Sequence, residues 1–305
     1  MGKKKPIALV FVKHFKPGYR AGGPTRSIIN IVDCLKNRID FRIVCLSYDH
    51  NSVEKYKNIK ANKWNAKYGI KILYLNRKVM NIFFYRNLFK NINPDFIYLN
   101  SFFDLNFSFI PLLSNRLFNK IPVLLAPRGE FSRGALALKN IKKKLFIYLS
   151  LMLKIHNTVE WHATSYNEKI NIKKIGFSPN KKIYVASNIS ILKTKEINFK
   201  KKEKGYLNII LPARISMMKN TFFAIKSIGS LSNKKIKFDL YGTIEDTIYW
   251  SKCLELIKSF PESNINYCGE CSHDSLIDKF AMYDLMFLPT KGENFGHSIL
   301  ESFAL

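Results

Sequence analysis

Short apolar runs rich in β-type residues alternate with helical stretches along most of this chain. The first five runs cover residues 7–11, 41–46, 70–75, 96–99 and 123–126. Between the first two, Ile28, Val32 and Leu35 recur at the spacing of a helix with one apolar face. Strands that are apolar throughout are typical of a parallel sheet covered by helices on both faces. The alternation therefore predicts an α/β fold.

The apolar pattern is interrupted once, by a polar, lysine-rich stretch at residues 193–204. A second series of runs then covers residues 207–211, 238–241 and 285–289, with helices expected at 222–231 and 276–280. A chain of 305 residues also exceeds the size at which one core usually stops growing. We therefore expect two Rossmann-like domains, over residues 1–192 and 205–305, joined by a linker at 193–204.

The second of these domains is expected to be incomplete. Its last predicted helix begins near Ser298, and the sequence stops at Leu305. At roughly 30 residues per strand–helix unit, about 70 residues are missing from a domain of this kind. Ile299, Leu300 and Phe303 would then be partly uncovered. We expect a fragment or a truncated reading frame, with a poorly stable C-terminal half and little activity.

The net charge is strongly positive. Lys and Arg number 50 against 22 Asp and Glu, which gives +28. The charge is spread along the chain without a nucleic-acid-binding motif, so compositional drift explains it best and nucleic acid is disfavoured as a partner. Such a surface is nevertheless attracted to anionic lipid. Residues 139–154 place three lysines beside an apolar run, which fits a helix lying flat on a membrane and, equally well, a buried helix with a solvated end.

Targeting and cysteine signals are weak. No apolar run is long enough to span a membrane, and the lysines at residues 3–5 precede a first strand better than they form a signal peptide. Five scattered cysteines indicate no disulfide framework, and Cys268 and Cys271 lack the context of a redox or zinc site. We expect a cytoplasmic protein without a bound metal.

A glycine-rich turn follows the first predicted strand. Gly22 and Gly23 lie directly before the amphipathic helix, with Arg20 and Arg26 on either side. Glycines allow backbone N–H groups to approach a ligand, and a helix N-terminus favours anions. The pattern indicates an anion-binding turn, but a simple tight turn explains it about as well.

The second domain has more specific signals, at the ends of two of its predicted strands. Arg214 and Lys219 follow the first strand, where open α/β sheets bind ligands, and two cations there suit a diphosphate. Near the end of the chain, Glu293 and Glu301 flank Asn294, Phe295 and Gly296 at the start of a helix. One carboxylate could contact a sugar and the other a ribose, with a diphosphate on the intervening N–H groups. Solvated loops and a surface helix are the alternatives.

With these residues, the chain resembles the retaining glycosyltransferases of family 4, which have the two-domain GT-B fold. Softer matches run along nearly the whole chain, at Ala21-Gly-Gly-Pro24, Ala126-Pro-Arg-Gly-Glu130, His162-Ala-Thr-Ser165, Gly242 and Gly269. The resemblance implies two domains that face each other across a cleft, with the acceptor on the N-terminal side and the nucleotide-sugar on the C-terminal side. One departure is that residues 99–103, where many members have a histidine, have none.

The resemblance also implies roles for particular residues. Arg214 and Lys219 would hold the donor's diphosphate, and Glu293 would lie near the transferred sugar and balance its charge. Glu301 would bind the ribose. Further donor contacts would come from Gly22, Gly23, Asn294, Phe295 and Gly296, and acceptor contacts from Arg128 and Glu130.

The expected reaction is sugar transfer with retention, from a nucleotide-sugar to a polysaccharide or lipid-linked acceptor. No Asp-x-Asp pair lies near a strand end, so no metal is expected. No cofactor is expected either, because the nucleotide-sugar would be a substrate. The expected location is the cytoplasmic face of the plasma membrane. The alternatives are an inactive truncated relative, an epimerase or phosphorylase with the same fold, and a basic nucleic-acid-binding protein.

Overall fold

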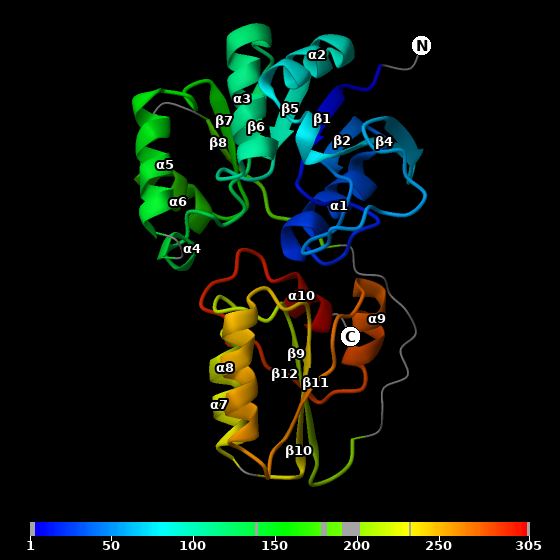
Figure 1. Ribbon diagram of the computed structural model, residues 1–305, viewed down its shortest axis with the longest axis vertical. Coiled ribbons are helices and arrows are strands. Elements are labelled where there is room, and N and C mark those ends of the chain that lie inside the picture. Colours follow the sequence, from blue (N-terminus) through cyan, green and yellow to red (C-terminus); the bar gives the residue numbers. More distant parts are fainter. Residues whose placement is uncertain (1–3, 138–139, 178–181, 191–201, 232, 304–305) are drawn as a thin grey trace. The chain divides into compact units, whose positions relative to one another are not determined.

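The computed structural model describes residues 4–137, 140–177, 182–190, 202–231 and 233–303. The chain divides into two compact units, Met1–Ile189 (unit 1) and Ser190–Leu305 (unit 2) (Figure 1). The expected linker at 193–204 lies mostly outside the described residues. No helix among the described residues combines the length and the apolar character needed to cross a membrane.

Unit 1 is built on an eight-stranded sheet with the order β3-β4-β2-β1-β5-β6-β7-β8. Every strand pair is parallel except β3 with β4. The strands are β1 (Ile7–Phe11), β2 (Asp40–Leu46), β3 (Trp64–Lys67), β4 (Ile70–Leu75), β5 (Phe96–Leu99), β6 (Val123–Leu125), β7 (Val159–Ala163) and β8 (Ile183–Val185).

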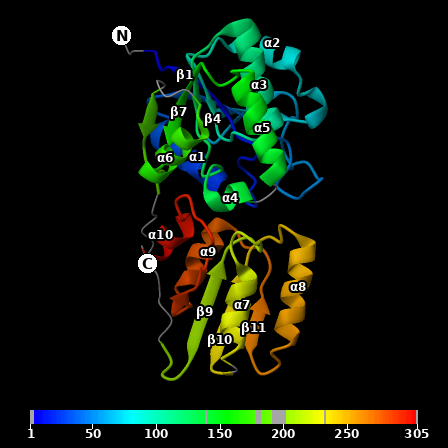
Figure 2. The same cartoon turned by 90° about the vertical axis from the view of Figure 1, so that its left-hand side faces the viewer.

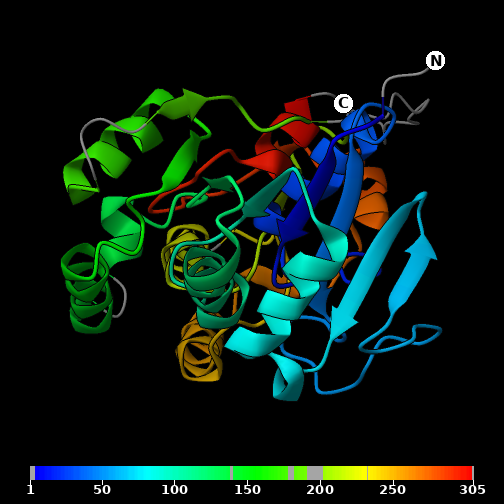
Figure 3. The same cartoon turned by 90° about the horizontal axis from the view of Figure 1, so that it is seen from above.

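Helices cover both faces of this sheet, as the apolar strands require. They are α1 (Gly23–Leu35), α2 (Ile82–Ile92), α3 (Ile110–Ser114), α4 (Arg133–Ala137), α5 (Asn140–Met152) and α6 (Tyr166–Ile175), with short turns η1 (Arg77–Val79), η2 (Leu105–Phe109) and η3 (Asn115–Asn119). The helix α1 packs Ile28 and Val32 against one face. The other face carries α2, α3, α5 and α6 (Figures 2 and 3).

Unit 2 has a four-stranded parallel sheet with the order β11-β10-β9-β12. Its elements are β9 (Leu207–Pro212), α7 (Thr221–Gly229), β10 (Ile236–Tyr241), α8 (Thr247–Lys258), β11 (Asn264–Tyr267), α9 (His273–Phe280), β12 (Leu285–Met286) and α10 (His297–Phe303). Its core joins Leu211 and Phe238 of the strands to Ile225 and Cys253 of the helices.

The expected α/β architecture is confirmed. Three of the predicted runs, β1, β4 and β5, match the observed strands residue for residue. The expected strand at 285–289 is shorter, because only Leu285 and Met286 pair with β9. The sequence interpretation did not include β3, β8 or α8, and it treated β7 only as part of a motif.

Candidate functional site

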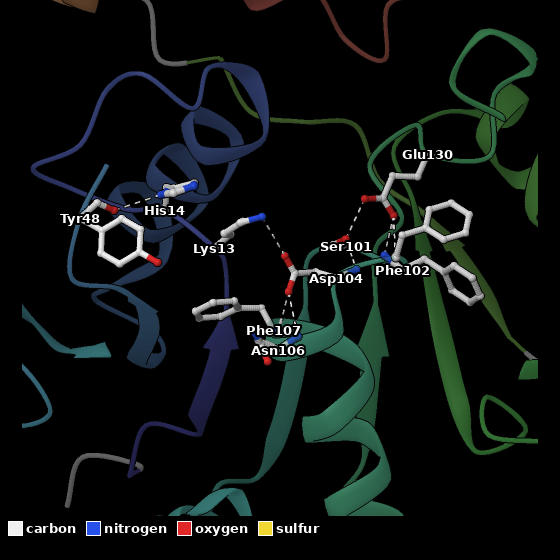
Figure 4. Close-up of polar contacts among 10 residues, drawn as sticks. Lys13, His14, Tyr48, Ser101, Phe102, Asp104, Asn106, Phe107 and Glu130 are labelled. Carbon is white, nitrogen blue, oxygen red and sulfur yellow. Dashed lines mark hydrogen bonds and ion pairs between the residues drawn. The ribbon is translucent and has the colours of Figure 1, made fainter. Parts of the chain in front are cut away.

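The carboxyl ends of β1 and β5 bring several polar side chains to one edge of the unit 1 sheet (Figure 4). Lys13 and His14 follow β1, and Asp104 follows β5. The Lys13 Nζ atom lies 3.5 Å from Asp104 Oδ2. The other carboxylate oxygen of Asp104 accepts hydrogen bonds from the backbone N–H groups of Asn106 and Phe107, at 3.0 and 2.9 Å. Asp104 therefore caps η2 and positions Lys13.

His14 is the least expected member of this edge. Its side chain is only 5% exposed, and its Nδ1 atom lies 3.2 Å from the backbone oxygen of Tyr48. Burial lowers the pKa of His14 to about 4, so the ring is neutral at pH 7. Among the described residues, its Nε2 atom has no hydrogen-bond partner. The sequence carried one signal for it, since His14 lies just past the end of a buried strand.

The predicted glycine turn lies at the same edge. Gly22 precedes α1 with a φ of 71°, a conformation that favours glycine, and Gly23 is the first helical residue. Within the turn, the N–H groups of Tyr19 and Arg20 donate to Asp49 Oδ2, at 2.9 and 3.3 Å. Asp49 thus binds the first part of this turn, and a role for Gly22 and Gly23 in anion binding stays a prediction.

Arg128 and Glu130, the predicted acceptor-side residues, both bind other residues of unit 1. The Arg128 guanidinium is buried and donates to Asn100 Oδ1 and the Tyr98 hydroxyl, at 2.9 and 2.7 Å, and to Asn188 Oδ1. The Glu130 carboxylate accepts hydrogen bonds from Ser101, Phe102 and Phe103 at 2.6–3.2 Å. Burial raises the pKa of Glu130, against the effect of these bonds. Their contact with an acceptor stays a prediction.

In unit 2, Arg214 lies in the loop after β9, and its partner lies in the loop after the neighbouring strand β10. Arg214 Nη1 is 3.0 Å from Glu245 Oε1. The two loops come very close where Gly242 follows β10. A Cβ atom on Gly242 would lie 2.1 Å from the backbone oxygen of Ala213, so only glycine fits there. Sequence reasoning missed Glu245, although its place after a strand end was a usable signal.

Lys219 and Glu293 form an ion pair between the loops after β9 and β12. These loops are also joined through Met218, whose backbone oxygen accepts hydrogen bonds from the Lys291 N–H at 2.9 Å and the Thr290 hydroxyl at 3.1 Å. Because β9 and β12 are neighbours, their carboxyl ends bring the two side chains together. The structure therefore gathers Arg214, Lys219 and Glu293 on adjacent loops at one sheet edge.

The predicted helix with the second glutamate is α10. Gly296 precedes it with a φ of 72°, and the Gly296 oxygen accepts hydrogen bonds from the N–H groups of Ile299 and Leu300. Glu301 is only 6% exposed, and its Oε1 atom lies 2.6 Å from His273 Nε2 at the start of α9. No sequence pattern pointed to His273 as the partner of Glu301.

Two further features bear on what the site could hold. Among the described residues, no group of three or more His, Cys, Asp or Glu side chains could hold a metal ion. A hollow of about 310 Å³ lies over β5 to β8 of unit 1, with Phe96, Leu124 and Tyr184 in its wall. None of the predicted site residues lines this hollow.

Comparison with known proteins identifies the fold. No protein-family model matches the sequence, and no curated protein does. In contrast, 138 chains of solved structures match. Anabaena HepE in complex with UDP and glucose has a TM-score of 0.71 at 14% identity, over 99% of this chain and 78% of that one. Sucrose-phosphate synthase from Thermosynechococcus elongatus has 0.70 at 13% identity, over 98% of this chain and 79% of that one.

A UDP-forming trehalose-phosphate synthase from Burkholderia xenovorans also matches, with a TM-score of 0.63 at 11% identity, over 99% of this chain and 81% of that one. These structures are GT-B glycosyltransferases. The expected GT-B fold is therefore confirmed. Membership of family 4 stays a prediction, because identities this low establish the fold alone.

Proposed function

We propose that this chain is a glycosyltransferase that transfers a sugar, with retention of configuration, from a nucleotide-sugar to a glycan acceptor. The main observation in support is the gathering of Arg214, Lys219 and Glu293 at the carboxyl edge of the unit 2 sheet. Open α/β sheets bind their ligands at this edge. The likeness to HepE, which was solved with UDP and glucose, supports a nucleotide-sugar as the donor.

Arg214 and Lys219 are assigned to the donor's diphosphate. Each now lies beside a carboxylate, Glu245 for Arg214 and Glu293 for Lys219. These ion pairs hold the two cations near the sheet edge before a ligand arrives. A diphosphate carries more negative charge than one carboxylate and can replace it as the partner. The cations then stabilise the charge that develops as the diphosphate leaves.

Glu293 is assigned a positioning role near the transferred sugar. Once the diphosphate binds Lys219, the Glu293 carboxylate is released to balance the positive character of the sugar carbon in the transition state. Glu301 is assigned to the ribose, with His273 holding its carboxylate in place. Asn294, Phe295 and Gly296 would contact the sugar and phosphates through their backbone, and Gly22 and Gly23 would also contact the phosphates.

The acceptor is assigned to unit 1, near Arg128 and Glu130, as a polysaccharide or a lipid-linked glycan. Their internal hydrogen bonds fix the loops after β5 and β6 on which an acceptor would rest. The reaction needs no cofactor, because the nucleotide-sugar is itself the substrate. It also needs no metal, since Arg214 and Lys219 supply the positive charge. We propose the cytoplasmic face of the plasma membrane as the protein's location.

UDP binding and sugar transfer in two single variants test this proposal. Arg214→Ala and Lys219→Ala should each slow transfer about 10²–10³-fold, because a charge contact made in the transition state is removed. Lys226→Ala and Lys252→Ala remove exposed lysines of α7 and α8 and serve as matched controls. All assays are run with and without EDTA.

Near-normal transfer in both site variants would contradict the donor-site assignment. Activity that disappears with EDTA and returns with Mg²⁺ or Mn²⁺ would contradict metal independence alone.

A further inference from the structure

The helix α5 is apolar on two opposite sides. One side packs Phe146, Ile147 and Leu151 against the core of unit 1, and Ser150 between them is 1% exposed. The opposite side exposes a row of large apolar residues: Ile141 (84% exposed), Leu145, Tyr148 (63%), Leu149, Met152 and, just past the helix, Leu153. Residues 141, 145, 148 and 152 follow the spacing of a single helix face. We call this exposed row the α5 stripe.

Exposed lysines lie on both flanks of the α5 stripe. Lys142 and Lys144 are exposed, and at 100° per residue they lie on opposite sides of the face that carries Ile141, Leu145 and Tyr148. Lys143 instead turns inward, where its Nζ atom donates to the backbone oxygen of Ala135 at 2.5 Å. This contact ties α5 to α4 and holds the stripe outward.

More positive charge lies at the C-terminal end of α5. Lys154 is exposed, and Arg116 of η3 donates to the backbone oxygens of Leu153 and Lys154. Residues 105–159 contain nine Lys and Arg but one acidic residue, Glu130. That carboxylate is already bound by Ser101 and Phe102. The segment of chain that carries the stripe is therefore cationic.

We propose that the α5 stripe docks on the surface of an anionic phospholipid membrane. An apolar face flanked by lysines, lying along a helix at the edge of its unit (Figure 1), matches the apolar and anionic layers of a membrane surface. A second copy of this chain fits poorly, because pairing two stripes would bring like-charged lysines together. The inference rests on the proposed location at a membrane but not on sugar transfer.

The sequence had left α5 open between a membrane-surface helix and a buried one. In the structure one face is packed on the core and the other is exposed, so each interpretation describes one side of the helix. The packed side keeps α5 folded in water, and no folding of the segment is required when the stripe meets lipid.

The experiment measures binding to phosphatidylcholine vesicles with and without about one third phosphatidylglycerol, by flotation. The wild-type chain should bind only the vesicles with phosphatidylglycerol. The Lys142→Gln, Lys144→Gln double variant should bind them roughly 25-fold more weakly, at about fivefold per lysine. The Ile141→Gln, Tyr148→Gln double variant should lose at least about tenfold. These side chains are exposed, so both variants should keep the wild-type melting temperature.

Two control variants carry the same changes elsewhere. Lys57→Gln with Lys60→Gln makes the same change in net charge at exposed positions, and Val53→Gln with Ile248→Gln replaces side chains that are 96% and 72% exposed. The controls should stay within about twofold of wild type.

If the Lys57, Lys60 control weakens vesicle binding as much as the Lys142, Lys144 variant does, the overall charge of the chain drives binding. That result would overturn the proposal. Wild-type binding by both α5 variants would overturn it too. So would a wild-type dimer, measured by sedimentation, that Ile141→Gln with Tyr148→Gln dissociates. Donor binding and transfer are separate readouts, so losing either leaves this result unaffected.

Discussion

His156 is a titratable side chain enclosed by aromatic rings. It is 2% exposed, and its ring centre lies 4.6 Å from that of Phe102 and 5.0 Å from that of Phe177. Its Nδ1 atom has no hydrogen-bond partner among the described residues. Burial lowers the pKa of His156 to about 3. In the unfolded chain the pKa returns to about 6.5.

The pKa of His156 predicts acid sensitivity of unit 1. Between pH 6.5 and 3 the unfolded state binds the proton and the folded state does not, so stability falls as the pH falls. In this range His156 lowers the free energy of unfolding by about 1.4 kcal/mol for each pH unit of acidification. Above pH 6.5 it adds no slope, because both states are then unprotonated. His156→Leu should reduce this slope, with less than about 1.5 kcal/mol of change at pH 7. Urea unfolding between pH 4 and 8 measures the slope and the change in stability at pH 7.

Phe177→Leu is the matched control for this prediction, because it alters the same aromatic cluster without removing a titratable group. Phe177→Leu should lower the free energy of unfolding by the same amount at every pH, so that the slope against pH is unchanged. An unchanged slope in His156→Leu would show that His156 does not contribute to the acid sensitivity. Some slope should remain in that variant, because burial also lowers the pKa of His14 to about 4.

At the residue scale, the sequence located side chains but not their partners. Arg214, Lys219 and Glu293 were predictable because they lie just past strand ends or beside a glycine-rich helix start. That Glu293 would bind Lys219 depends on β12 being the neighbour of β9, and strand order is a property of the whole sheet. Glu245 and His273 were missed for the same reason. Their partners, Arg214 and Glu301, lie 31 and 28 residues away in the sequence.

Gly242 controls the packing of two loops in unit 2. It follows β10 with a φ of 153°, in the range that favours glycine, and its N–H donates to the Gly269 oxygen at 2.9 Å. Because Ala213 leaves no room for a Cβ atom, any other residue must push apart the loops after β9 and β10. Arg214 and Glu245 lie on those same two loops.

Gly242→Ala should therefore destabilise unit 2 and weaken UDP binding together. We expect a loss of about 1–3 kcal/mol from strain and overpacking. Gly205→Ala is the control, because Gly205 has a φ of 87° but no atom within 4 Å of an added Cβ. It should cost only about 1–2 kcal/mol of backbone strain and leave UDP binding unchanged. Thermal melting and calorimetric titration with UDP measure stability and UDP affinity in the two variants. Unchanged UDP affinity in Gly242→Ala would contradict the link between loop packing and UDP binding.

At the element scale, the sequence predicted best the strands that are buried on both faces. β1 and β5 are apolar throughout, so their boundaries show directly in the sequence. β3 is an edge strand with the polar pattern Trp-Asn-Ala-Lys, which resembles a loop. The usable signal in the sequence was the glycine of its turn. Tyr68 and Gly69 both have positive φ in the structure, as a tight two-residue hairpin requires. α8 was missed although Asp246 caps it by accepting a hydrogen bond from the Tyr249 N–H.

At the scale of the whole molecule, the two units have cores of unequal size. Unit 1 has an eight-stranded sheet with a buried cluster on each face. The described residues of unit 2 form four strands and one buried cluster, and its edge strand β12 pairs through two residues, with Leu285 47% exposed. A smaller unit buries a smaller fraction of the surface that its unfolded chain exposes. The α/β alternation predicted both sheets, and the sequence also predicted a less stable C-terminal half, but the strand order and the division of the buried residues into clusters come from the structure.

We expect unit 2 to unfold at a lower urea concentration than unit 1. Each fully buried apolar side chain contributes roughly 1.5–3 kcal/mol to stability. The net stability of a domain is only about 5–15 kcal/mol. The unit with the smaller core should therefore unfold first. Hydrogen exchange at increasing urea, read by mass spectrometry, measures each unit without any substitution. Peptides from β9 and β10 should lose protection before those from β1 and β2. Simultaneous loss would mean that the units unfold as one, and earlier loss in β1 and β2 would reverse the predicted order.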